Sequence, residues 1–280
     1  MFDKISQQTQ KLMLLYKQAS FLKGKDKQLD ELLRICDTKE QWSLIYRLLS
    51  KFNYIQYPQY GTLLKSMADY IENIVKDNES SYCLLAVSKG TEADSSQALL
   101  QHLKVPLWKS FEKRLDTCNS FGRLHKYIKE HPDVSYILVD EFCGSGKTLI
   151  LRLQDIIKEG VEAKICVLAG MEDAIHRIRD IGYDIHCCFE LQKGISGDEE
   201  MNDDEIEDAI KNMLVLEGKL ATQINETQLS DHSLGYGKAE SLFAIQGSNP
   251  PNNNFPIFWW KRYADYKERK TLLNRVQRGY

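Results

Sequence analysis

The sequence predicts an α/β fold in which a mostly parallel central sheet is flanked by helices, with an N-terminal helical subdomain before it. An apolar run at residues 136–139 leads into a glycine-rich loop and then into residues with helical spacing. A second strand–loop–helix unit begins at residues 82–87. Because neither run alternates with polar residues, both are expected to be strands buried on two faces, as in parallel sheets. Repeated units of this kind are typical of the α/β class.

Residues 1–78 are predicted to form the helical subdomain. Apolar residues recur there at helical spacing in four stripes, of which the third contains Trp42, Ile45, Tyr46 and Leu49. Asp37 or Thr38 is the expected N-cap of this helix, with Glu40 or Gln41 as the matching third residue. Packing within the subdomain is the simpler interpretation of the stripes, and a surface for docking a partner is the alternative.

Residues 79–280 are predicted to form the α/β domain, which ends in an aromatic and basic extension. Further strands are expected at 163–169 and 183–191, with a helix at 173–181 between them. The mixed polar segment 104–132 is expected to be either a mobile flap over the site or a connecting helix. His186 lies in one of these strands, and a structural role in the sheet is favoured over metal binding.

The C-terminal part has two unusual segments. Eight acidic residues gather at 194–208, where the absence of regularly spaced oxygen ligands favours a solvated loop over a calcium site. A strand is expected at 241–245, followed by an apolar-aromatic segment and a basic end helix. Trp259 and Trp260 are expected to be buried in the core. Base stacking in a nucleic-acid complex is the alternative for these tryptophans.

The composition is that of an ordinary globular chain of 280 residues, with 42% hydrophobic and 28% charged residues. The net charge of −3 gives no general attraction to nucleic acid. No apolar run approaches the roughly 18 residues of a membrane span, and the N-terminus does not have the pattern of a signal peptide. Seven scattered cysteines without metal-ligand spacing are most simply reduced thiols. We therefore expect a cytoplasmic protein with no membrane contact.

The central stretch, residues 136–148, has the most specific chemistry. The loop amides and the helix start would attract phosphate. Asp140 and Glu141 would repel a phosphate but accept hydrogen bonds from hydroxyls or hold a hydrated cation. A ligand with both a phosphate and a sugar diol satisfies the whole stretch. The ending Gly-Lys-Thr suggests a P-loop, but Glu141 stands where that motif needs glycine, which disfavours a nucleoside triphosphatase.

The same stretch resembles the diphosphate-sugar loop of type I phosphoribosyltransferases. The apolar strand, the Asp140-Glu141 pair and the loop 144–148 follow that family's pattern. Residues 87–90 look like the family's pyrophosphate loop. The layout as a whole resembles the divergent phosphoribosyltransferase-like domain of bacterial conflict systems, which carries similar C-terminal motifs. Their counterparts here are residues 234–237, 242–245, 250–254 and 256–260.

The resemblance implies a set of site residues. Asp140 and Glu141 would act in catalysis by binding the ribose hydroxyls. The 5-phosphate would be held by Cys143, Gly144, Ser145, Gly146, Lys147 and Thr148. The pyrophosphate would contact Ser88, Lys89 and Gly90, with a cis peptide expected before the lysine. Mg²⁺ would bind through the ligand near the two acids, with no residue of the chain as a direct metal ligand.

The resemblance implies a protein that binds phosphoribosyl diphosphate or a nucleotide and transfers or hydrolyses it, within anti-phage defence and with a possible partner protein. Gly144 departs from the purine enzymes, which carry an aspartate at that position as an acid or base. Glycine transfers no proton, so a sensor that binds the ligand without turnover is the alternative.

Overall fold

The computed structural model describes residues 12–76, 80–88, 95–112, 114–161 and 163–276. The chain divides into two compact units, and each is described here by itself. The first, the sheet unit, comprises residues 57–191. The second, the helical unit, combines the residues up to 56 with those from 192 onwards.

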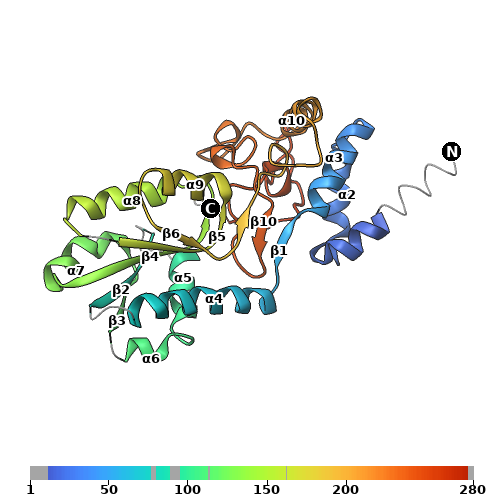
Figure 1. Cartoon of the computed structure of the whole chain (residues 1–280). Helices are drawn as coiled ribbons and strands as arrows, with labels where there is room; N and C mark the ends of the chain where they lie inside the picture. Colours follow the sequence, from blue (N-terminus) through green and yellow to red (C-terminus); the bar gives the residue numbers. More distant parts are fainter. Residues whose placement is uncertain (1–11, 77–79, 89–94, 113, 162, 277–280) are drawn as a thin grey trace. The chain divides into compact units, whose positions relative to one another are not determined.

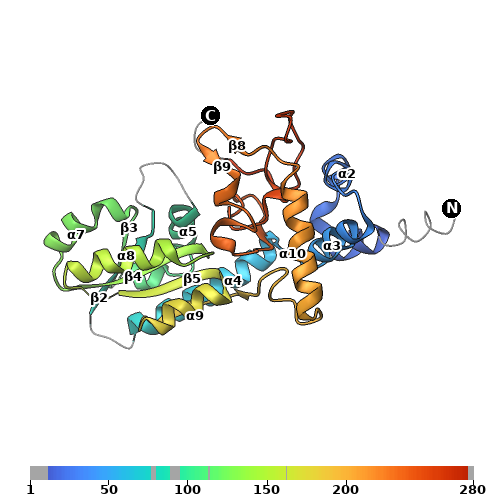
Figure 2. The ribbon, with the colours of Figure 1, turned by 90° about the horizontal axis from the view of Figure 1, so that it is seen from above.

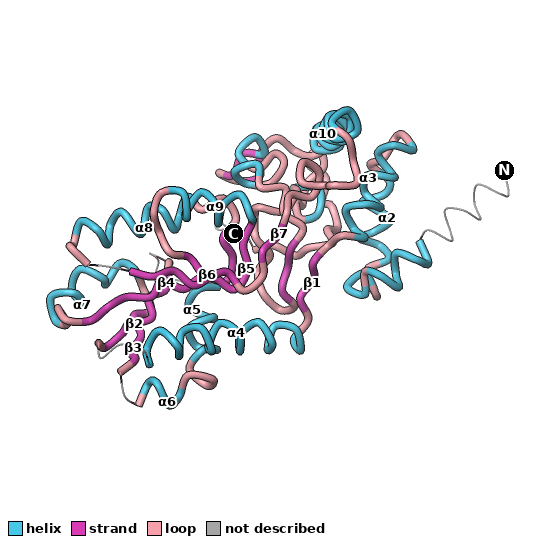
Figure 3. Tube along the Cα trace, in the orientation of Figure 1, coloured by secondary structure: helices cyan, strands magenta, loops and turns pink. Residues whose placement is uncertain are grey.

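The sheet unit is built on a parallel sheet with the strand order β3-β2-β4-β5-β6, and the short strand β7 pairs with β5. Its strands lie side by side between helices (Figure 3). The strands are β2 (Ser81–Ala86), β3 (Leu115–Cys118), β4 (Val134–Cys143), β5 (Ala163–Met171), β6 (Ile185–Cys187) and β7 (Glu190–Leu191). The arrangement confirms the predicted fold class.

Helices cover both faces of this sheet. Helices α8 and α9 lie on one face, and α4 and α5 lie on the other (Figures 1 and 2). The bounds are α4 (Tyr57–Lys76), α5 (Ser95–Leu103), α6 (Trp108–Phe111), α7 (Leu124–Glu130), α8 (Lys147–Lys158) and α9 (Glu172–Asp180). The middle strands are fully buried, as Leu84, Leu138 and Val167 each expose 0% of their surface. Burial on both faces explains why the apolar runs of these strands do not alternate with polar residues.

The segment 104–132 differs from both predicted alternatives. It contains the edge strand β3 and the short helices α6 and α7, besides a 3₁₀ turn at Phe121–Arg123. Leu115 and Cys118 are buried while Asp116 is exposed. A strand as short as β3 has too few residues to show a periodicity, so the sequence does not indicate it. The segment 183–191, predicted as one strand, is divided into β6 and β7.

The helical unit contains helices from both ends of the chain and one parallel strand pair, β1 with β10. Its helices and strands are η1 (Ser20–Leu22), α2 (Asp26–Arg34), α3 (Lys39–Ser50), β1 (Asn53–Ile55), α10 (Asp203–Glu217), β8 (Gln223–Ile224), β9 (Thr227–Gln228), η3 (Leu229–Asp231), η4 (Tyr236–Lys238), β10 (Phe243–Ile245) and η5 (Pro256–Phe258). The side chain of Thr38 caps α3 by accepting a hydrogen bond from the backbone of Gln41, which confirms the predicted cap.

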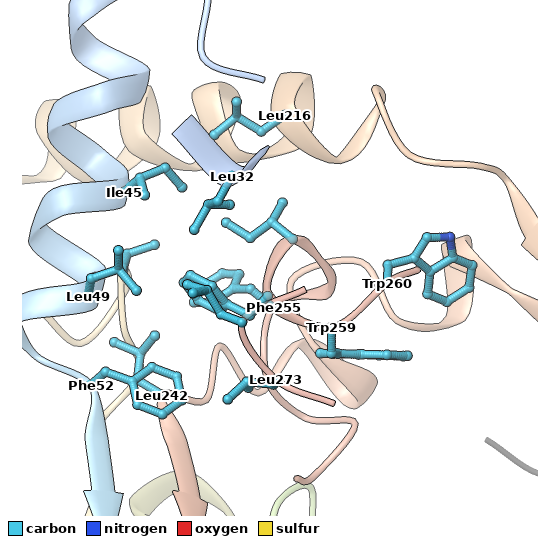
Figure 4. Packing of buried hydrophobic residues seen from close by; sticks show 14 of the residues in the cluster. Leu32, Ile45, Leu49, Phe52, Leu216, Leu242, Phe255, Trp259, Trp260 and Leu273 are labelled. Atoms are coloured by element: carbon cyan, nitrogen blue, oxygen red, sulfur yellow. The ribbon is translucent and has the colours of Figure 1, made fainter. Parts of the chain in front are cut away.

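The core of the helical unit joins α2, α3 and α10 to the C-terminal aromatic segment (Figure 4). Trp259 and Trp260 expose 1% and 0% of their surface, which confirms core burial over base stacking. The predicted basic end helix was wrong, because residues 261–276 contain no helix. Arg269 is buried instead and donates hydrogen bonds to the carbonyls of Trp260 and Ile257. A buried cation needs such acceptors.

The acidic segment is not entirely solvated, contrary to expectation. The side chain of Asp198 is fully buried and pairs with Arg47 of α3 and with Lys51, the residue after this helix. Asn202 and Glu205 form a reciprocal capping box at the start of α10. The charges therefore act locally, as an ion-pair cluster and as a helix cap.

These units divide the chain differently from the predicted boundary near residue 78. Helix α4 lies in the sheet unit, where the apolar residues Met67 and Ile71 are buried and the helix packs on β5. The C-terminal residues from 192 lie with the N-terminal helices, because α10 packs on α3. Apolar stripes show that a helix is buried but do not identify its partner. Within the described residues, no helix is long and apolar enough to cross a membrane.

Candidate functional site

The two loops predicted to bind the ligand follow neighbouring strands. Strands β2 and β4 pair in parallel, with Ala86 opposite Val139, so both loops leave the same edge of the sheet. In α/β proteins, ligands bind at this carboxyl edge. Strand β4 continues four residues further and still pairs with β5, up to Cys143 opposite Gly170. The predicted acidic pair thus lies at the end of a strand, where the backbone is fixed.

The two acids differ in accessibility. Asp140 is half-buried, and its carboxylate accepts a hydrogen bond of 2.8 Å from the backbone N–H of Glu141. Glu141 exposes only 5% of its surface. Burial raises the pKa of Tyr60 on α4, and the charge of Glu141 adds to this effect. Glu141 therefore lies near that helix. Asp140 is therefore the acid better placed to meet a ligand from solvent.

The glycine-rich loop turns the chain from β4 into α8. Gly146 is the N-cap of α8 and has φ 73°, a conformation that favours glycine. Lys147 and Thr148 are the first residues of the helix and are exposed. The first amides of a helix lack partners within it, so this end attracts anions. Arg177 of α9 steadies the loop by donating a hydrogen bond of 3.0 Å to the carbonyl of Ser145.

Cys143 is buried between the loop and β5. It exposes 2% of its surface, and burial raises the pKa of its thiol. A Cβ atom on the facing Gly170 would lie 3.2 Å from the Cβ of Cys143 and 2.9 Å from the Cδ1 of Ile175. The missing side chain at Gly170 gives these two residues their space. The Cys143 side chain therefore packs the loop against the sheet.

The first loop begins at Ser88, whose neighbours hold it from three sides. Its N–H donates to the hydroxyl of Ser96 at 3.3 Å, and its carbonyl accepts from the N–H of Phe121 at 2.8 Å. Arg152 of α8 donates to the carbonyl of Val87 at 2.9 Å. Lys89 and Gly90 lie outside the described residues, and so does the peptide predicted to be cis.

Several residues that build the site were missed from sequence. Arg152 lies with its guanidinium carbon 4.9 Å from the centre of the Phe121 ring, and it connects the helix of one loop to the start of the other. Arg152 stands among the apolar residues of α8, and an arginine at such a position needs a hydrogen-bond acceptor. This pattern in the sequence could have indicated its role. Arg177 and Tyr60 had no such signal, because only the fold brings them to the loops.

The predicted Mg²⁺ site has a compatible donor. No group of three or more His, Cys, Asp or Glu side chains that could hold a metal ion occurs in the described part of the chain. Asp140 supplies a hard carboxylate oxygen, and Mg²⁺ is commonly bound by one or two carboxylates together with ligand phosphates. Binding of the ion through a phosphorylated ligand fits this donor set.

Comparison with models of known families identifies the family of this chain. The model of the PRTase-CE family matches residues 27–275, nearly the whole chain. The chain belongs to the PRTase-CE family. The membership agrees with the phosphoribosyltransferase resemblance of residues 136–148. Curated protein sequences gave no significant match.

Solved phosphoribosyltransferase structures are similar to this PRTase-CE chain over about half its length. Hypoxanthine-guanine phosphoribosyltransferase of Schistosoma mansoni, in complex with IMP, is 15% identical, with a TM-score of 0.36. The match covers 49% of this chain and 65% of that one, slightly under two thirds.

Two further structures are similar. Orotate phosphoribosyltransferase of Mycobacterium tuberculosis H37Rv, in complex with 5-phospho-alpha-D-ribosyl 1-diphosphate, is 9% identical, with a TM-score of 0.28 and coverage of 46% and 73%. Xanthine-guanine-hypoxanthine phosphoribosyltransferase of Helicobacter pylori is 11% identical, with a TM-score of 0.32 and coverage of 50% and 84%.

Proposed function

We propose that this PRTase-CE protein binds phosphoribosyl diphosphate, or a nucleotide, with Mg²⁺ at the carboxyl edge of its sheet, and transfers or hydrolyses the phosphoribosyl group. One observation carries the proposal. The half-buried carboxylate of Asp140 and the exposed helix start at Lys147-Thr148 lie on one strand–loop–helix unit. A carboxylate suits a diol and a helix start suits a phosphate, and a phosphoribosyl group contains both.

Each residue has a distinct part in the proposed reaction. Asp140 accepts hydrogen bonds from the ribose hydroxyls. The amides at Gly146, Lys147 and Thr148, with the threonine hydroxyl, bind the 5-phosphate. Loss of pyrophosphate breaks the bond at the anomeric carbon and leaves positive charge on the sugar, which the neighbouring carboxylate stabilises. Mg²⁺, when bound, balances the charge of the departing diphosphate.

A non-catalytic sensor is the second candidate, and two observations favour it. Gly144 leaves the loop without a side chain that could transfer a proton. Glu141, the second acid of the pair, is buried near Tyr60 and exposes only 5% of its surface. A protein with these features would bind the ligand and report its presence without cleaving it.

The resemblance to conflict-system domains supports a further proposal, that the protein is an effector or component of anti-phage defence and acts with a partner protein. Cells carrying the gene with its native neighbours are expected to restrict phage plating. The Asp140→Asn variant should lose that restriction. Equal plating on the variant and the original would contradict a defence role for the site.

The biochemical test combines calorimetry with an assay for pyrophosphate release. The Asp140→Asn variant is expected to bind phosphoribosyl diphosphate and Mg²⁺ more weakly by about 1.5–3 kcal/mol, roughly 10- to 150-fold, because a charged hydrogen-bond acceptor is lost. The control variant Asp155→Asn removes the same charge within α8, eight residues after the first residue of the helix and about 12 Å from its start. It should bind the ligand normally.

The two candidates then separate by turnover. Pyrophosphate release that Asp140→Asn abolishes identifies an enzyme. Tight binding without release identifies the sensor. If neither variant nor original binds phosphoribosyl diphosphate or a nucleotide, both candidates are wrong.

A further inference from the structure

Arg152 of α8 carries a positive charge that lies at the site without an acidic partner. Its Nε atom donates to the carbonyl of Val87 at 2.9 Å, and its guanidinium carbon lies 4.9 Å from the ring centre of Phe121. Among the residues that the structure describes, no carboxylate forms an ion pair with this guanidinium. Asp155 lies three residues further along the helix, and its carboxylate is 3.6 Å from the ammonium of Lys158 instead.

Partial burial makes the missing anion costly. Arg152 is half-buried, and burial lowers its pKa, so the charged guanidinium is less stable here than in water. A desolvated charge is stabilised when an opposite charge pairs with it. The Val87 carbonyl and the Phe121 ring carry only partial charges and compensate the cation in part. An anion bound beside Arg152 would therefore gain more than one bound by an arginine on the open surface.

The two terminal nitrogens of the Arg152 guanidinium, Nη1 and Nη2, can meet a ligand. The hydrogen bond to Val87 uses Nε, and within the described part of the chain neither terminal nitrogen has an acceptor. Neither of them is among the buried polar atoms that have no partner, so solvent reaches both. A guanidinium presents these donors in a planar fork that matches two oxygens of a phosphate. Arg152 can therefore hold Val87 with one nitrogen and a phosphate with the other two.

The position of Arg152 selects the diphosphate end of the ligand. Val87 directly follows β2, and residues 88–90 after it are the ones assigned to the pyrophosphate. Strand β2 pairs in parallel with β4, so this loop and the 5-phosphate loop leave the same edge of the sheet. The hydrogen bond of Arg152 goes to the beginning of the first loop. A ligand that spans both loops would therefore place its diphosphate next to Arg152.

We propose that Arg152 is a further ligand-binding residue, whose terminal nitrogens donate hydrogen bonds to the diphosphate of phosphoribosyl diphosphate. The assignment rests on the function proposed above and adds a preference to it. A nucleotide carries a base at the anomeric carbon, where phosphoribosyl diphosphate carries its diphosphate, so Arg152 favours the diphosphate ligand.

The same contact would act during the reaction. The bond between the anomeric carbon and the diphosphate oxygen breaks, and both of its electrons leave with the oxygen. Water or another acceptor supplies the electron pair of the new bond at that carbon and releases a proton to the solvent. The guanidinium of Arg152 stabilises the negative charge that gathers on the departing diphosphate.

Calorimetry with three ligands, each in the presence of Mg²⁺, tests the assignment. Arg152→Gln is expected to bind phosphoribosyl diphosphate and pyrophosphate about 10- to 100-fold more weakly, the usual loss for a hydrogen bond between charged groups. Its affinity for ribose 5-phosphate should not change. Arg152→Lys keeps the charge and should bind both diphosphates more tightly than Arg152→Gln does. The control variant Lys158→Gln removes the same charge from the last, exposed turn of α8 and should bind all three ligands normally.

Hydrogen exchange of the ligand-free variants separates binding from support of the loop. Both variants at Arg152 lose the forked guanidinium, so the segment around Val87 should open to a similar extent in both. A difference between them in diphosphate affinity then reports the charge, which a purely structural role does not explain. Equal loss of diphosphate affinity in the two variants, or an equal loss for ribose 5-phosphate, would refute the direct contact.

The failure of this assignment differs from failure of the proposed function. If the original chain binds phosphoribosyl diphosphate and Arg152→Gln binds it equally well, only the role of Arg152 is wrong. If the original chain binds none of the three ligands, the proposed function is wrong and the role of Arg152 with it.

Discussion

Arg152 offers a quantitative test of how the two loops are held together. Its guanidinium donates to the carbonyl of Val87 at 2.9 Å and lies 4.9 Å from the ring centre of Phe121, whose N–H in turn binds Ser88. Burial lowers the pKa of Arg152, in agreement with a partly desolvated cation. Replacing this side chain with alanine removes both contacts and leaves the Val87 carbonyl without its donor.

The cost follows from the two contacts. A hydrogen bond from a charged donor contributes about 1.5–3 kcal/mol, and a cation–π contact adds about 0.5–2 kcal/mol. Because Arg152 is only half-buried, we take values near the lower end and expect Arg152→Ala to cost about 2 kcal/mol. Local opening of the segment around Val87 should then become roughly 30-fold more frequent.

Hydrogen exchange with peptide-level mass spectrometry measures this opening directly. The peptides that contain Val87 and Phe121 should exchange faster in Arg152→Ala, while those of the helical unit should not change. Leu151→Ala is the matched control, since Leu151 is the preceding residue of α8 and is 56% exposed. Exchange at Val87 that is equal in the two variants would refute the bracing role of Arg152.

Further predictions concern the helical unit. Arg47 and Lys51 hold the pKa of the Asp198 carboxyl well below its usual range. The ion pairs therefore stabilise the folded unit fully above the unfolded pKa of about 4, and this stabilisation is lost as the pH falls below it. Denaturant titration should accordingly show Asp198→Asn less stable than the original at pH 6, with the difference shrinking toward pH 3; a constant difference contradicts the ion pairs. Gly235→Ala should prevent folding of the unit, because its Cβ would lie 1.9 Å from the backbone oxygen of Asn253. Gly24→Ala, at a similar φ but with nothing within 4 Å, should cost only about 1–2 kcal/mol, and equal thermal stability of the two variants would refute the steric argument.

The sheet could be predicted because its middle strands carry long apolar runs. Residues 82–87 and 136–139 are buried on both faces, and α5 and α8 are the helices that follow them in the chain, so pattern and structure agree. The edge strand β3 could not be predicted. Of its four residues only Leu115 and Cys118 are buried, which is not the alternation of a strand, and the pairing with β2 makes them one.

The site could be predicted in part, because some of its residues are neighbours in the sequence. Asp140, Gly146 and Thr148 follow one another along one strand–loop–helix unit, so the sequence shows their arrangement. The burial of Glu141 beside Tyr60 is not local, since α4 precedes β4 by more than fifty residues. The different accessibility of the two acids therefore needed the fold. Likewise, the C-terminal residues suggested a basic end helix, whereas Arg269 lies in the core.

A crystal structure of the protein with phosphoribosyl diphosphate and Mg²⁺ tests the central claim most directly. We predict density for the 5-phosphate at the amides of Gly146, Lys147 and Thr148, with the ribose hydroxyls at the Asp140 carboxylate. Ligand density elsewhere on the chain, or a 5-phosphate turned away from the start of α8, would contradict the assignment of this edge of the sheet as the binding site.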